Sequence, residues 1–212
     1  QSISPEIRVR AAQAAGGLAN YMHGLIDERR KHPGDDMLSV LVRAEEDGDK
    51  LSPEELLTQS IGLLVAGFET TIGLIGNGVR QLLLNPGELR KLQQRPELAA
   101  SAVEECLRFD GPIPATRRVL HEDAEIGGFT IPKDSELLLS IASAHRDTAV
   151  YADPDRFDIE RRQSSNLAFG GGIHFCLGAH LARLESQIAI RQLVQRFPRL
   201  ALESEKPEWG ES

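Results

Sequence analysis

The sequence predicts a mainly α-helical protein with a small β-hairpin or sheet. Apolar residues recur at helical spacing along most of its 212 residues, and proline or capping residues open the periodic segments. The period changes to that of a strand only in a short stretch after Arg117. Hydrophobic residues make up 41% of the chain and charged residues 26%, which argues against an intrinsically disordered protein.

Each helix is predicted from a cap or proline in its first turn, an apolar face and a breaker at its end. Ser4-Pro5-Glu6 opens the first helix, and Lys31-His32-Pro33-Gly34 closes it. The later helices are expected over about 35–47, over 53–84, in two segments opened by Pro86 and Pro96, and over about 179–196. Residues 119–129, with Gly127-Gly128, predict a small hairpin, and residues 136–140 predict a further strand.

The helix over 53–84 is the longest element, about 48 Å at roughly 1.5 Å per residue. Residues 61–79 are almost uncharged, with Glu69 as the one acid, so we expect this middle part to be buried on most sides. The helix also carries several glycines, each of which costs roughly 1 kcal/mol relative to alanine. We interpret them as sites where another backbone or a flat ligand approaches closely.

Charge and cysteine content narrow the class of protein. A formal net charge of −8 argues against a nucleic-acid-binding protein, which would normally carry a basic face. We recognise no apolar run of the length of a bilayer span and no opening signal segment, so we expect no membrane association. The two cysteines, Cys106 and Cys176, exclude a disulfide framework and favour a reducing, cytoplasmic setting.

One stretch indicates chemistry, Phe169-Gly170-Gly171-Gly172-Ile173-His174-Phe175-Cys176-Leu177-Gly178. It places a cysteine in a glycine-rich loop directly before a helix, whose free N–H groups and positive dipole end stabilise a thiolate. The glycines allow a flat partner to approach the backbone. The alternative is a buried cysteine in a turn, and four glycines interleaved with Phe, His and Cys argue against it. His174 and Cys176 lack the second pair that a structural zinc site needs.

This loop resembles the haem loop of the cytochromes P-450, the haem-thiolate monooxygenases, at every fixed position of Phe-Gly-x-Gly-x-His/Arg-x-Cys-x-Gly. Further matches follow in the order of that family. Ala66-Gly67-Phe68-Glu69-Thr70-Thr71 is similar to the oxygen-binding stretch of its long central helix, which is locally distorted. Glu105-Cys106-Leu107-Arg108 is similar to its Glu-x-x-Arg, and Pro154-Asp155-Arg156-Phe157 would supply the arginine that completes a buried network. Cys106 itself is interpreted as a packing residue.

The resemblance implies haem b (iron protoporphyrin IX) as the cofactor and a role for single residues. Cys176 would be the iron ligand, with Phe169, Gly170 and Gly178 in the loop around it. His174 and Arg118 would bind the haem propionates, with Arg117 as the neighbouring alternative to Arg118. Thr70 would donate a hydrogen bond to bound dioxygen and Glu69 would help to deliver protons, next to Ala66 and Gly67. Residues 112–116, together with Leu63 and Ala66, would line the substrate pocket.

The implied activity is that of a bacterial monooxygenase that inserts one oxygen atom from molecular oxygen into a small apolar organic substrate, by hydroxylation or epoxidation. Electrons would come from NAD(P)H through a ferredoxin or flavodoxin and its reductase. Family members are roughly twice this length, so we expect residues 1–212 to be a single partial domain, the C-terminal haem-binding half. A truncated, non-catalytic fragment and a haem-binding module without turnover are the alternatives.

Overall fold

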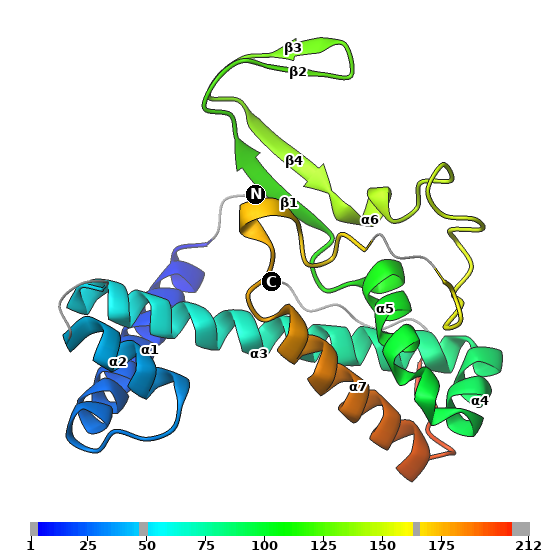
Figure 1. The fold of residues 1–212 in the computed structure, drawn as a ribbon, viewed down its shortest axis with the longest axis horizontal. Helices are drawn as coiled ribbons and strands as arrows, with labels where there is room; N and C mark the ends of the chain where they lie inside the picture. Colours follow the sequence, from blue (N-terminus) through cyan, green and yellow to red (C-terminus); the bar gives the residue numbers. More distant parts are fainter. Residues whose placement is uncertain (1–3, 47–50, 163–165, 205–212) are drawn as a thin grey trace. The chain divides into compact units, whose positions relative to one another are not determined.

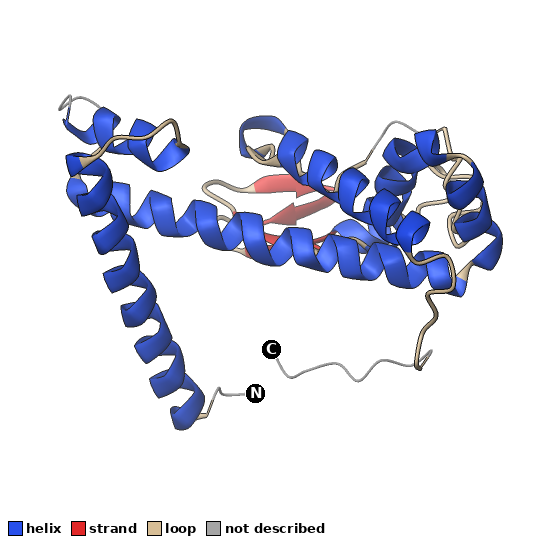
Figure 2. Cartoon of the chain, turned by 90° about the horizontal axis from the view of Figure 1, so that it is seen from below, coloured by secondary structure: helices blue, strands red, loops and turns tan. Residues whose placement is uncertain are grey.

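The computed structural model describes residues 4–46, 51–162 and 166–204. The chain divides between Phe68 and Glu69 into two compact units, and this boundary falls inside the long helix α3 (Pro53–Leu84). Helices make up most of the described chain, with a few short strands (Figure 2), so the predicted fold class is confirmed. That residues 1–212 act as one partial domain stays a prediction.

The first unit consists of α1 (Pro5–Lys31), α2 (Met37–Glu46) and the first half of α3. The predicted cap of α1 is confirmed, because the Ser4 side chain accepts a hydrogen bond from the backbone of Ile7 at 3.3 Å. The buried core of this unit is small and consists of Met22, Ile26, Val42 and Leu56. The expected end of the second helix, Asp47, lies outside the described residues.

The second unit carries the remaining elements (Figure 1). Its helical elements after α3 are α4 (Pro86–Gln94), the 3₁₀ turn η1 (Pro96–Leu98), α5 (Ala99–Asp110), α6 (Ile141–Ala144), the 3₁₀ turn η2 (Gly172–His174) and α7 (Ala179–Arg196). The core forms where α3, α4, α5 and α7 meet, with Leu82, Leu92, Val103 and Ile190 almost fully buried. The bounds predicted for the last helix are confirmed.

The strands form two separate antiparallel pairs. β1 (Ala115–Val119) pairs with β4 (Glu136–Ser140), and β2 (Ala124–Ile126) pairs with β3 (Phe129–Ile131). Gly127 and Gly128 adopt φ values of +60° and +82°, which glycine reaches without strain, so the predicted hairpin is confirmed there. The hairpin is shorter than predicted, because Val119 belongs to β1 and His121 lies between β1 and β2. The backbone of Leu120 forms hydrogen bonds with Ser135 and Asp134, which extends the contact between β1 and β4.

The bounds predicted for α3 are confirmed, but the predicted burial of its middle is wrong. Its exposed apolar side chains include Leu64, Val65, Phe68 and Ile72. The apolar pattern identifies a face that can be buried, whereas burial also needs a covering surface, and the described residues do not cover these side chains. By length and composition α3 would also pass as a membrane span, contrary to the sequence expectation, but core helices of water-soluble proteins pass the same test.

Two of the glycines of α3 confirm the expected close approach. A Cβ at Gly78 would lie 3.0 Å from Cys106 Sγ and 3.1 Å from Ile190 Cδ1, and one at Gly73 would lie 3.1 Å from Pro112 Cβ. Glycine at these two positions therefore allows α3 to pack closely on α5, on α7 and on the segment after α5. Gly62, Gly67 and Gly76 have no such neighbour within 4 Å among the described residues.

A buried ion pair connects α5 to the segment that precedes residues 169–178, the cysteine loop. Nε and Nη2 of Arg108 donate to the two carboxylate oxygens of Glu105 at 2.7 and 2.8 Å, and the side chains are 3% and 1% exposed. Nη1 of Arg108 donates to the carbonyls of His145 and Pro154, both at 2.9 Å. Glu105 also accepts from the backbone N–H of Asp158 at 2.8 Å. The pair therefore bonds to several points of residues 145–158.

The arginine that completes this network is Arg161, and the prediction from the Pro-x-Arg-Phe segment is wrong. Arg161 Nε lies 3.2 Å from a Glu105 carboxylate oxygen, and its side chain is 11% exposed. The Arg156 side chain is 61% exposed, and only its carbonyl joins the network, by accepting from Arg108. The chain turns at Asp153, where φ is +47°, so the motif located the segment but not the inward-facing arginine.

His145 connects this network to the start of the cysteine loop. Its side chain is buried, and its Nε2 accepts a hydrogen bond from the backbone N–H of Leu167 at 2.9 Å. Burial, and next the charge of Arg108, lower the pKa of His145. A neutral imidazole is required for Nε2 to act as an acceptor, so the lowered pKa and the hydrogen bond agree. His145 is therefore a structural residue that links the Arg108 network to Leu167.

Replacing Glu105 by alanine should destabilise the second unit by about 3–5 kcal/mol, because it leaves the guanidinium of Arg108 buried without its carboxylate. The matched control is Glu160→Ala, which removes an exposed carboxylate that pairs with Lys91 and Arg95. Urea denaturation followed by circular dichroism measures both variants. Equal midpoints for Glu105→Ala and Glu160→Ala would contradict the importance given to the buried pair.

The lowered pKa of His145 predicts a loss of stability in acid. As the pH falls, the unfolded chain, in which histidine has a pKa of about 6.5, takes up this proton at a higher pH than the folded chain does. The contribution of His145 to the free energy of unfolding is therefore complete above that pH and decreases as the pH falls towards the folded pKa. His145→Gln keeps an acceptor that does not titrate, and should flatten this decrease. Denaturation at about pH 7.5 and about pH 5.5 measures the free energy of unfolding at both pH values. His23→Gln, at an exposed position, is the control. An equal decrease in the free energy of unfolding for wild type and His145→Gln would contradict this prediction.

Candidate active site

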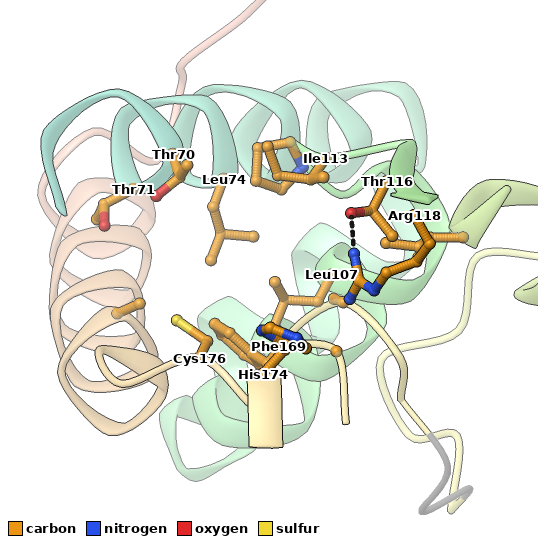
Figure 3. A pocket seen from close by; sticks show the side chains of 15 residues that line it. Thr70, Thr71, Leu74, Leu107, Ile113, Thr116, Arg118, Phe169, His174 and Cys176 are labelled. Atoms are coloured by element: carbon orange, nitrogen blue, oxygen red, sulfur yellow. Dashed lines mark hydrogen bonds between the residues drawn. The ribbon is translucent and has the colours of Figure 1, made fainter. Parts of the chain in front are cut away.

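A cavity of about 240 Å³ lies in the second unit and is partly open to solvent. Figure 3 shows Thr70 and Thr71 of α3 on one side of it and Cys176 on another, with Arg118 of β1 reaching towards it. The lining is mostly apolar and consists of Thr70, Thr71, Leu74, Leu107, Pro112, Ile113, Thr116, Arg118, Ile141, Ala168, Phe169, Gly170, His174, Cys176 and Ala182. The cavity thus collects residues from α3, from β1 and from the cysteine loop, which are far apart in the sequence.

The loop before α7 is folded so that Cys176 stands at the cavity wall with an exposed side chain. Gly170 and Gly172 adopt φ values of +70° and +62°, a region that favours glycine. The backbone N–H of Cys176 donates to the carbonyl of Phe169 at 2.9 Å, which closes the loop on itself. Gly178 occupies the N-cap position of α7, so the thiol lies close to the start of that helix.

Cys106 has the opposite environment. It is fully buried among α3, α5 and α7, and burial raises the pKa of its thiol, so the neutral form is strongly favoured. The interpretation of Cys106 as a packing residue is confirmed. Of the two cysteines, Cys176 is the one that a ligand or reagent can reach.

Strand alternation distinguishes Arg118 from Arg117. Successive side chains of a strand point to opposite faces, and here Arg118 lines the cavity whereas Arg117 is 75% exposed and pairs with Glu136. Nη1 of Arg118 donates to Thr116 Oγ1 at 3.1 Å (Figure 3). Arg118 and His174 therefore both bring N–H groups to the cavity, which suits carboxylates on a ligand.

The stretch of α3 that resembles the oxygen-binding segment is only partly at the cavity. Thr70 lines it, whereas the expectation that Glu69 is buried is wrong, because this side chain is exposed. α3 runs as α-helix through residues 66–71, so the expected local distortion is not seen there. Ala66 and Gly67 belong to the other compact unit, and their expected roles stay predictions.

Some lining residues were not singled out from the sequence. Thr71 follows Thr70 directly, and Leu74 lies one helical turn after it, so helical spacing could have indicated Leu74. Leu107 of α5 is buried and also lines the cavity. Of residues 112–116, Pro112, Ile113 and Thr116 line this cavity, and their expected contact with substrate stays a prediction.

The donors at the cavity fit a flat, largely apolar group that carries carboxylates and brings a metal with its own ligands. Among the described residues no group of three or more His, Cys, Asp or Glu side chains could hold a metal ion, so a metal bound by Cys176 would need further ligands from a cofactor. Within the part of the chain that the structure describes, a Cβ at Gly171 or Gly178 would meet nothing within 4 Å, which leaves space beside the loop. Haem meets these requirements.

Comparison with known proteins agrees with this geometry. The chain is 48% identical over 190 residues to the putative cytochrome P450 YjiB of Bacillus subtilis, covering 90% of this chain and 48% of that protein. It is 43% identical over 201 residues to 6-deoxyerythronolide B hydroxylase of Saccharopolyspora erythraea, covering 94% and 50%. The ligand-free crystal structure of CYP164A2 from Mycobacterium smegmatis superposes with a TM-score of 0.91 at 41% identity, covering 99% of this chain and 53% of that one.

The chain therefore spans about half the length of the curated relatives that it matches. A model of the family described as Cytochrome P450 matches residues 2–209, almost the whole chain. Together with the identities to bacterial relatives and the similarity of fold, this match shows that the chain belongs to the cytochrome P450 family.

Proposed function

We propose that this chain is the haem-binding, oxygen-activating region of a monooxygenase that inserts one oxygen atom into a small apolar organic substrate, by hydroxylation or epoxidation. The observation that carries the proposal is the accessible thiol of Cys176 at the wall of a mostly apolar cavity that Thr70 also lines. It is supported by the relatives, one of which is named a hydroxylase.

The residues at the cavity divide the work as follows. Cys176, as a thiolate, would hold the iron of haem b, with Phe169, Gly170 and Gly178 shaping the loop around the sulfur. Arg118 and His174 would donate hydrogen bonds to the haem carboxylates. When bound, the haem supplies the reductive activation of molecular oxygen.

Residues of α3 supply the protons. Thr70 holds a hydroxyl at the cavity wall, where it donates a hydrogen bond and passes on a proton. Glu69, exposed on the same helix, exchanges protons with solvent. Leu74, Pro112 and Ile113 supply apolar surface that excludes water and suits an apolar substrate.

Electrons reach the site from NAD(P)H through a ferredoxin or flavodoxin and its reductase, in the cytoplasm, without nucleic acid or membrane as a partner. Among the described residues, a Cβ at Gly171 or Gly178 would have no neighbour within 4 Å, which is consistent with a partner protein that approaches this loop to deliver electrons.

A second candidate is a haem-binding module, or fragment, without turnover. It is favoured by the exposure of large apolar side chains on α3, such as Phe68 and Ile72, and on α7, such as Leu181 and Leu184. A substrate pocket that excludes water needs such faces to be covered.

Haem reconstitution tests the proposal. The wild-type chain, reduced under carbon monoxide, should show the red-shifted Soret band of a thiolate-ligated haem, because Cys176 is the reachable thiol. Cys176→Ser should lose this band while its helix content, measured by circular dichroism, stays similar.

Cys106→Ala is the matched control, since it removes the other cysteine from a packed site and should keep the thiolate band. A thiolate-type band in Cys176→Ser, or a histidine-type band in the wild type, would contradict the assignment of Cys176. A thiolate band without oxidation of any substrate in the presence of redox partners would favour the module without turnover.

A further inference from the structure

A guanidinium of α7 lies over the aromatic ring that begins the cysteine loop. The Cζ atom of Arg183 is 4.4 Å from the centroid of the Phe169 ring, which is the distance of a cation–π contact. Phe169 is also the residue whose carbonyl accepts the backbone N–H of Cys176 at 2.9 Å. The ring and the cysteine backbone are therefore parts of one short, hydrogen-bonded segment.

Glu104 of α5 holds this guanidinium in place. Nε of Arg183 donates to Oε1 of Glu104 at 2.5 Å, and Nη2 lies 3.4 Å from Oε2, so both carboxylate oxygens are engaged. The two side chains are 38% exposed for Glu104 and 26% exposed for Arg183. A charged pair of this kind at a partly exposed site is weak by itself, so its effect must come from the geometry that it imposes.

Glu104 also holds the chain just before the ring. Nδ2 of Asn166 donates to the carbonyl of Glu104 at 3.1 Å and to its Oε2 at 3.2 Å. Oδ1 of Asn166 accepts the backbone N–H of Ala168 at 3.0 Å. One carboxylate thus reaches the segment 166–169 twice, through Asn166 at its start and through Arg183 at the ring of its last residue.

The arrangement requires an arginine. A planar guanidinium can stack on the ring with its face while its edge donates to both oxygens of a carboxylate. The ammonium group of lysine keeps the charge but cannot form both contacts in one fixed geometry. Arginine and lysine at position 183 should therefore differ in their effect on the loop, although both carry a positive charge.

We propose that Arg183, held by Glu104, is a positioning residue that fixes the Phe169 ring and, through the Phe169 carbonyl, the backbone of Cys176. The inference rests on the proposed function, because the purpose of this positioning is to present the thiol to the haem iron. Its physical content, the restraint of the loop by Arg183, concerns the chain without cofactor as well.

The test is amide hydrogen exchange of the full chain without haem, resolved at the Cys176 N–H by NMR. Arg183→Gln and Glu104→Gln should each speed exchange at Cys176 by about threefold to tenfold, as expected for the loss of a cation–π contact with its ion pair. Arg183→Lys should give a smaller increase. The control is Arg95→Gln, which removes an arginine that pairs with the exposed Glu160, and it should leave exchange at Cys176 unchanged.

A double variant tests the route through the ring. If Arg183 acts through Phe169, Arg183→Gln should add less than about twofold in the background of Phe169→Leu. Unchanged exchange at Cys176 in Arg183→Gln and Glu104→Gln would overturn the proposal, as would an equal acceleration of amides throughout the second unit. If Arg183→Gln does not fold, Arg183→Lys carries the test, and exchange equal to that of wild type would overturn it.

A spectroscopic signature separates this proposal from the proposed function. In the haem-loaded chain, Arg183→Lys should broaden or shift the thiolate Soret band, whereas Arg95→Gln should not. Failure of the wild-type chain to form a thiolate-ligated haem would refute the proposed function. The exchange result would still decide whether Arg183 positions the loop.

Discussion

The buried carboxylate of Glu105 is the interaction on which the rest of the second unit depends. A carboxylate with a side chain 1% exposed is tolerated only when cations and N–H donors replace its lost hydration, and Arg108, Arg161 and the backbone of Asp158 do so. Each partner lies on, or bonds to, the irregular chain between α6 and the cysteine loop. A segment with little regular structure is therefore placed by satisfying one buried charge.

The same helix reaches the cysteine loop by two routes that begin at adjacent residues. From Glu105 the route runs through Arg108 to the backbone of His145, whose ring accepts from Leu167. From Glu104 it runs through Asn166 and Arg183 to the chain around Phe169. Both routes end within a few residues of the loop, so α5 serves as the support of the thiol. A ligand that must meet a metal at a fixed distance benefits from such a rigid support.

The features that local sequence determines could be predicted. Pro53 and Pro86 mark helix starts through their fixed φ and missing N–H, and Gly170 and Gly172 are needed where φ is positive. The loop around Cys176 was recognisable because its residue types and spacing occur together in one family. Arg118 could be separated from Arg117 only when β1 was known to pair with β4, since the pairing fixes which face lines the cavity.

The features that depend on distant chain could not be predicted. Arg161 replaces Arg156 in the buried network because the turns after Asp153 decide which side chain faces inward. The prediction that the middle of α3 is buried, together with Glu69, was wrong. An apolar pattern does not tell whether the covering surface belongs to the same chain. The relatives are about twice as long, which agrees with that explanation. The contact of Arg183 with Phe169 leaves no periodic or motif signal.

The most direct test of the central claim, that α5 and the glycine-rich loop present Cys176 to a haem iron, is X-ray absorption spectroscopy at the iron edge of the haem-loaded chain. The account predicts one sulfur atom in the first coordination shell of the iron, besides the nitrogen atoms of the macrocycle. A shell of nitrogen and oxygen alone, or a chain that retains no iron, would contradict it.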